Sequence, residues 1–187
     1  MRLRHQDTAF QAGAFLWGAA EAFLFFIVPD VLIGFAALRR GVRAGLIAAV
    51  LAALGASVGG AAMYLWSTRA PEQALAAVEA VPAVSPAMIQ TAADEMADGW
   101  FVASLKGPLT NTPYKVYAAL APTQGAGLPA FAAAGLPVRL PRFLGVAVVM
   151  AIIGAALKGR VSDRIVIAVF TAGWVLFYGW FWLAHPG

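Results

Sequence analysis

The chain has 187 residues, of which 61% are hydrophobic and only 12% are charged, and its mean hydropathy is +0.78. A water-soluble domain of this length cannot bury so much apolar surface, which excludes a soluble globular protein and predicts an integral membrane protein. The formal net charge is +4, but Lys and Arg stand at the ends of apolar runs, where they orient membrane spans, so no nucleic-acid partner is expected.

Cysteine and histidine offer little site chemistry. The sequence has no cysteine, and its two histidines, His5 and His185, stand near opposite ends. We therefore expect no disulfide, no metal site, no cofactor and no enzyme that depends on a histidine base. No polar linker is long enough to separate two domains, so residues 1–187 are predicted to form a single membrane domain.

The first apolar segment, residues 9–38, is too long for one upright span and too short for two. Two acids interrupt it, Glu21 and Asp30, and the second directly follows Pro29. Because proline removes a backbone donor and disfavours helix at the preceding residue, we predict two half-helices that turn back here as a re-entrant hairpin. Asp30 would begin the second half-helix, where its side chain can cap backbone N–H groups.

Basic residues flank this hairpin on both sides. Arg2 and Arg4 precede it, and Arg39, Arg40 and Arg43 follow it. Because positive charge marks the cytoplasmic side of membrane proteins, both ends of the hairpin, and so the N-terminus, are expected in the cytoplasm.

The next segment, residues 44–68, is uncharged and long enough for a tilted transmembrane helix. Gly55 and Gly59 lie four residues apart on it, a spacing that lets another helix pack closely. The polar stretch of residues 70–98 follows, where Ser85 is predicted to cap a short helix on the outer surface.

Residues 100–138 form a second apolar region that prolines and glycines interrupt, with Pro113 and Lys115 near its centre. So many helix breakers exclude a continuous helix, and a second re-entrant hairpin is predicted, entering from the outer face. Transmembrane helices over residues 143–157 and 165–184 complete the chain.

An internal repeat is visible in the two spans. Residues 43–56 (RAGLIAAVLAALGA) and 142–155 (RFLGVAVVMAIIGA) match at arginine, alanine, valine and glycine positions, although alanine-rich helices also resemble one another by chance. A unit of one hairpin and one span crosses the membrane an odd number of times, so its second copy must be inverted. The predicted fold class is therefore all-α integral membrane, an inverted repeat of a re-entrant helical hairpin plus a transmembrane helix, with a further C-terminal transmembrane helix.

Charged residues at membrane depth are the candidate site. Glu21 is expected either to bind a proton or cation, or only to pair with Lys115 or Lys106 and hold the two hairpins together. Asp30 is a second candidate for proton or ion coupling, with the helix cap as its alternative. Lys115 is expected to hold a phosphate or carboxylate, unless it extends toward the outer surface.

Arg139 and Arg142 precede the span over residues 143–157. Their default interpretation is that they lie on the outer side and fix the topology, and the alternative is that they contact a lipid headgroup.

These motifs resemble those of the DedA family of membrane proteins, whose shared region is also called the SNARE-associated or VTT domain. The residues that carry the resemblance are Glu21, Pro29 and Asp30, then Gly55, Gly59 and Tyr64, then Pro113, Tyr114 and Lys115, and finally Phe131 and residues 139–143. Lys115 stands where many members have arginine, and lysine presents a point charge to a phosphate in place of a planar fork.

The resemblance implies a lipid transporter, either a flippase or scramblase-like, in a bacterial inner (cell) membrane. Its substrate would be a phosphate-bearing lipid such as undecaprenyl phosphate or a phospholipid, with proton coupling as a further expectation. Carried over, Glu21 and Asp30 would handle protons and Lys115 the headgroup phosphate. The alternative is a membrane assembly protein without transport, in which the face around Gly55 and the outer helix recruit partners. The lipid, its direction and the oligomeric state stay open.

Overall fold

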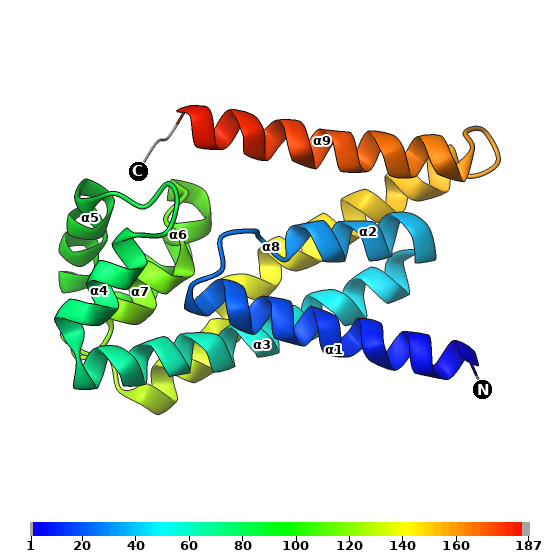
Figure 1. Ribbon diagram of the computed structural model, residues 1–187. Coiled ribbons are helices and arrows are strands. Elements are labelled where there is room, and N and C mark those ends of the chain that lie inside the picture. The colour runs from blue at the N-terminus through cyan, green and yellow to red at the C-terminus, as the bar shows by residue number, and fades with distance from the viewer. Residues whose placement is uncertain (1, 185–187) are drawn as a thin grey trace.

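The computed structural model describes residues 2–184, with side chains from Thr8 onward; His185 and the side chains of Arg2, Arg4 and His5 lie outside this part. The described residues are helical, without a β-strand (Figure 1). The helices are α1 (Arg2–Phe23), α2 (Asp30–Arg40), α3 (Val42–Arg69), α4 (Pro71–Glu79), α5 (Pro86–Ala97), α6 (Trp100–Thr110), α7 (Tyr114–Leu120), α8 (Leu128–Leu157) and α9 (Asp163–Ala184).

Three of the described helices, α3, α8 and α9, are long and apolar enough to cross a membrane, with 28, 30 and 22 residues. In Figure 1 they run in alternating directions: α3 toward the left, α8 toward the right and α9 toward the left again. The short helices α4 to α7 form a compact group at the left end, which we call the lobe. The all-helical part of the predicted fold class is therefore confirmed for the described residues, and three of their helices are compatible with a membrane protein.

The first apolar segment is broken between α1 and α2, at residues 24–29, and the chain reverses direction there (Figure 1). The indole of Trp17 donates a hydrogen bond of 2.9 Å to the carbonyl oxygen of Ile27, and the backbone N–H of Val28 donates one of 2.8 Å to the Tyr178 hydroxyl. In a helix, backbone groups find hydrogen-bond partners within the helix. These two bonds replace such partners for the Ile27 carbonyl and the Val28 N–H, which lie in the break. α1 packs along α3, while α2 packs against both α3 and α8.

Glycine lets α1 and α3 approach each other closely. A Cβ atom added at Gly55 would collide with the carbonyl oxygen of Phe15, and one added at Gly59 would collide with that of Ala19. Both glycines therefore face α1 of the same chain, and any larger side chain there would push the two helices apart.

The second broken region differs from the prediction. α6 and α7 are separate short helices, but α8 continues from Leu128 to Leu157 through Pro137 and Pro141. The predicted boundary between a hairpin over residues 100–138 and a span that begins at residue 143 is therefore wrong, because α8 runs across it. A proline inside a helix costs about 3 kcal/mol, and α8 offsets this by packing along α3, where its backbone comes so near that a Cβ at Gly135 would collide with the Ser57 hydroxyl.

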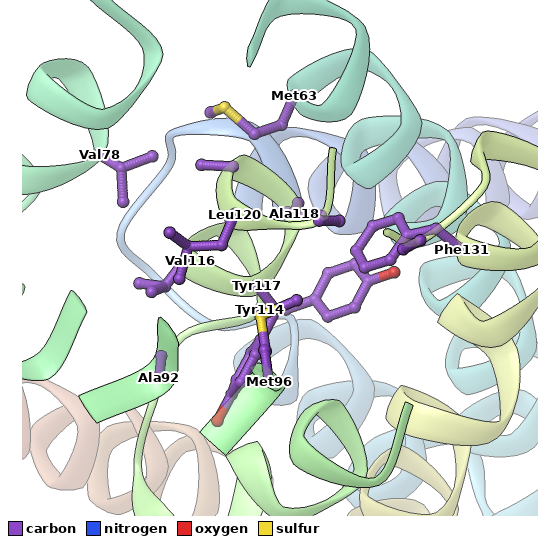
Figure 2. Packing of buried hydrophobic residues seen from close by; sticks show 14 of the residues in the cluster. Met63, Val78, Ala92, Met96, Tyr114, Val116, Tyr117, Ala118, Leu120 and Phe131 are labelled. Atoms are coloured by element: carbon purple, nitrogen blue, oxygen red, sulfur yellow. The ribbon is translucent and has the colours of Figure 1, made fainter. Parts of the chain in front are cut away.

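α7 is buried along its whole length. Figure 2 shows its side chains among apolar residues from four other helices: Met63, Val78, Ala92, Met96 and Phe131. Just after α7, the Tyr64 hydroxyl donates a hydrogen bond of 2.7 Å to the carbonyl oxygen of Ala126. Lys115, the second residue of α7, is thus carried by a firmly packed element.

Candidate functional site

Five charged side chains from four helices line one cavity of about 810 Å³. We call them the charged cluster: Glu21 of α1, Asp30 of α2, Lys115 of α7, and Arg139 and Arg142 of α8. All five were candidates from the sequence, although they are spread over more than a hundred positions of the chain. Gly55 and Gly59 do not line this cavity.

The deeper part of the charged cluster is the inner cluster, Glu21, Lys115 and Arg139. Arg139 Nη2 donates a hydrogen bond to Glu21 Oε2, and Lys115 Nζ lies 3.6 Å from Glu21 Oε1. All three side chains are buried, so each cation offsets part of the cost of removing the carboxylate from water. Lys106, the other expected partner of Glu21, is exposed.

Aromatic rings fix the position of Arg139. Its guanidinium carbon lies 4.9 Å from the ring centroid of Phe143 and 5.7 Å from that of Tyr114. Tyr114 in turn stacks on Phe131, with ring centroids 5.5 Å apart and ring planes 7° from parallel. A cation over two ring faces gains electrostatic attraction as well as packing, so the Arg139 side chain is held in one orientation.

The second part of the charged cluster is the rim pair, Asp30 and Arg142. Arg142 Nη2 donates a hydrogen bond of 3.0 Å to Asp30 Oδ2. The Asp30 side chain is only 4% exposed, whereas that of Arg142 is 41% exposed. Asp30 Oδ1 is buried without a hydrogen-bond partner, so this carboxylate is only half satisfied.

The helix cap expected of Asp30 is not formed. Pro29 occupies the N-cap position of α2, with no side-chain cap, and Asp30 is the first helical residue. That prediction is wrong because Asp30 lies one residue past the N-cap, and its carboxylate pairs with the guanidinium of Arg142, from a distant part of the chain.

Arg139 and Arg142 do not stand just before the start of a helix, as the predicted boundaries had them. Since α8 begins at Leu128, both arginines fall about midway along a continuous helix. Each is paired with an acid there. The sequence contained the arginines and the acids, but no local pattern could indicate that they meet.

The charged cluster carries a surplus of positive charge. Three cations face two carboxylates, which leaves a net charge of +1 when all five groups are ionised. Such a site favours an anion with several acceptor oxygens, above all a phosphate, since arginine and lysine donate strong charge-assisted hydrogen bonds to it. The described residues contain no group of three His, Cys, Asp or Glu side chains placed to hold a metal ion.

The sequence analysis did not single out Tyr178, whose hydroxyl accepts a hydrogen bond from the Val28 N–H in the break between α1 and α2. The available signal was a single phenol within the apolar last span. It also missed Gly145 and Gly173, which line the cavity from α8 and α9 and which no sequence pattern distinguishes from other helix glycines. No family model, curated protein or solved structure matches the chain.

Proposed function

We propose that the protein moves a phosphate-bearing lipid across the membrane, with the phosphate bound by Lys115, Arg139 and Arg142. The observation that carries this proposal is the surplus cation of the charged cluster inside a large cavity. An unbalanced buried charge is costly, and an anionic headgroup would balance it. The apolar remainder of the cavity suits the hydrocarbon part of the same molecule.

The arrangement of the two breaks supports an inverted repeat of two re-entrant hairpins. An offset of 99 residues relates residues 43–56 to 142–155 and moves the first break, residues 24–29, to residues 123–128. That range overlaps the gap between α7 and α8. Adjacent stretches of α3 and α8 are also antiparallel, since Gly45 lies beside Ala147 and Ser57 lies beside Gly135.

The charges at the helix ends support an orientation with the lobe outside the cell. The basic residues that flank the α2–α3 junction and the α8–α9 turn then lie in the cytoplasm: Arg39, Arg40, Arg43, Lys158, Arg160 and Arg164. Together with the resemblance to the DedA family, this favours a bacterial inner membrane with the N-terminus inside.

Within the proposal, the two acids have different tasks. Glu21 is the fixed counter-ion, because two cations hold it in place. Asp30 is the group that exchanges a proton, because its one partner, Arg142, is partly exposed and can turn toward an arriving phosphate. When the phosphate takes Arg142, a proton from the cavity neutralises Asp30, so that two anions need not share one cation.

A lipid-flipping assay with the purified protein in liposomes tests the proposal, with NBD-labelled phosphatidic acid as probe and dithionite as quencher. The wild-type protein is expected to flip the probe, and Lys115→Met is expected to slow the initial rate about tenfold or more, since a charge-assisted hydrogen bond contributes 1.5–3 kcal/mol. Lys115→Met leaves Glu21 paired with Arg139, so the protein should still fold. Lys106→Met, at an exposed lysine, is the matched control, and equal rates in both variants would reject the proposal.

Of the two docking surfaces expected for a partner-recruiting assembly protein, the face around Gly55 and the outer helix, the first is not free. The face of α3 that carries Gly55 and Gly59 is covered by α1 of the same chain. A leucine at either position would therefore disturb the fold itself, and its effect would not indicate a missing partner.

A further inference from the structure

The cavity has an apolar part beyond the charged cluster. It continues between α8 and α9, and from Arg139 to Met150 the rise along α8 is about 16 Å, roughly half of the hydrocarbon thickness of a bilayer. We call this part the tail slot. It is lined by Gly145, Val149 and Met150 of α8 and by Phe170, Gly173 and Phe177 of α9.

α9 is attached by a small number of contacts with α2 and with the break between α1 and α2. Arg39 and Asp163 form an ion pair of 2.6 Å at the start of α9, and Phe35 and Phe170 lie with ring centroids 6.0 Å apart. Further along α9, the Tyr178 hydroxyl accepts a hydrogen bond from the Val28 N–H, in the break between α1 and α2. These contacts join α9 to α2 and to the break in antiparallel fashion (Figure 1), and α9 packs along no described helix as closely as α1 packs along α3.

Two glycines in the walls of the tail slot have no packing explanation. A Cβ atom added at Gly145 or at Gly173 would meet no atom within 4 Å, in contrast to the glycines between α1 and α3. Neither has a positive φ angle that would require glycine. A glycine inside a helix is less favourable than alanine by about 1 kcal/mol. Gly179 of α9 has free space around it as well, but only Gly145 and Gly173 of these three line the cavity.

Unpartnered polar atoms at the head of the slot point to a ligand. Asp30 Oδ1 and Arg139 Nε are both buried without a hydrogen-bond partner, and both residues line the same cavity as the glycines. A molecule with a polar end and an apolar end therefore fits this space better than either a free anion or a hydrocarbon alone. The volume of about 810 Å³ is within the usual range of small-molecule sites.

We infer that the tail slot binds a hydrocarbon chain of the lipid whose phosphate occupies the charged cluster. This inference rests on the proposed function and specifies the substrate as a lipid bound by head and tail together. The chain points from the level of the arginines toward the Leu157 end of α8, away from the lobe. A lipid in the leaflet on the lobe side has this orientation, with its tail toward the bilayer centre, so loading takes place from that leaflet.

Leucine substitutions that fill the slot test the inference. Gly145→Leu and Gly173→Leu each place a side chain in the open space, and leucine favours helix over glycine, so folding should be preserved. Gly179→Leu is the matched control, because Gly179 also lies on α9 with free space around it but does not line the cavity. Binding of dioleoyl and of dihexanoyl phosphatidic acid to the purified proteins is then compared.

The expected result is a loss of dioleoyl phosphatidic acid binding by about tenfold in both slot variants, with dihexanoyl binding unchanged and Gly179→Leu like the wild type. Equal binding of the long-chain lipid by wild type and slot variants would overturn the inference while the proposed function stands. A loss of both lipids in the slot variants would overturn it too, because the substitutions would then act on the headgroup site. If the wild-type protein binds neither lipid, the proposed function fails first.

Discussion

The inner cluster and the rim pair each join a carboxylate to basic side chains, but they differ in how many cations hold the carboxylate and in how far those cations are buried. Glu21 is buried between two cations, one of which, Arg139, is itself held over aromatic rings. Asp30 has one cation, and that arginine is 41% exposed. Burial and the number of partners thus divide the charged cluster into a tightly held part and a loosely held part, and the proposed function assigns the positioning of the phosphate to the first and the response to it to the second.

The largest effect is expected in the fixed part. Arg139→Met leaves the buried Glu21 carboxylate with only Lys115, 3.6 Å away, and breaking a buried pair in this way costs about 3–5 kcal/mol. The apparent Tm of the purified protein should fall by about 10 °C or more. The double variant Glu21→Gln/Arg139→Met, which removes both charges, should recover much of this loss, and a single variant as stable as the wild type would show that the pair does not anchor the fold.

The rim pair should separate transport from stability. Arg142→Met leaves the buried Asp30 carboxylate without its cation, but under the proposal a proton from the cavity can neutralise Asp30, so we expect a smaller loss of stability than for Arg139→Met. Flipping of NBD-labelled phosphatidic acid should slow by about tenfold. Arg142→Lys keeps the charge but not the fork and should give an intermediate rate. A stability loss as large as that of Arg139→Met would mean that the two regions do not differ.

The response to a proton gradient should distinguish the proposed roles of the two acids, Asp30 and Glu21. In liposomes, flipping by the wild-type protein should accelerate when a proton gradient is imposed, because Asp30 exchanges a proton when the phosphate takes Arg142. Asp30→Asn should make the rate independent of the gradient without abolishing it. A gradient response that survives in Asp30→Asn but vanishes in a folded Glu21→Gln variant would exchange the roles of the two acids.

The smallest effect is expected where an ion pair lies outside the cavity. Arg39 and Asp163 pair at 2.6 Å, but the Asp163 side chain is 74% exposed and that of Arg39 25%, and ion pairs that water reaches contribute little. Arg39→Ala should leave both the apparent Tm and the flipping rate unchanged at physiological salt. A measurable loss of flipping would show that the end of α9 must stay attached to α2.

The parts of the fold that depend on local composition could be predicted from the sequence. Hydropathy alone located α3 and α9, because an apolar stretch of sufficient length has one stable form in a bilayer. Pro29 located the break before α2, and Ser85 was correctly assigned as the cap of α5, where its hydroxyl accepts from the Met88 N–H at 3.2 Å.

The parts that failed depend on contacts between distant segments. The prolines of α8 suggested a break, but they lie in a helix held by its packing along α3, and local proline rules do not include that energy. The arginines of α8 were assigned to a membrane boundary for the same reason. The proximity of Glu21 and Lys115 was expected as an ion pair between the hairpins, yet the closer partner of Glu21 is Arg139. Because the start of α8 was predicted too late in the chain, two of the five residues of the charged cluster, Arg139 and Arg142, were assigned to the wrong part of the fold.

Binding of a lipid phosphate by the surplus charge of the inner cluster can be measured directly as a headgroup preference. The affinities of the wild-type protein and Lys115→Met for dihexanoyl phosphatidic acid and dihexanoyl phosphatidylcholine give that preference without a contribution from long tails. The wild-type protein should prefer the anionic lipid by about tenfold or more, and Lys115→Met should lose the preference while it stays folded. Equal affinity of the wild-type protein for the two headgroups would contradict a site at Lys115 and Arg139 whose surplus positive charge selects an anionic phosphate.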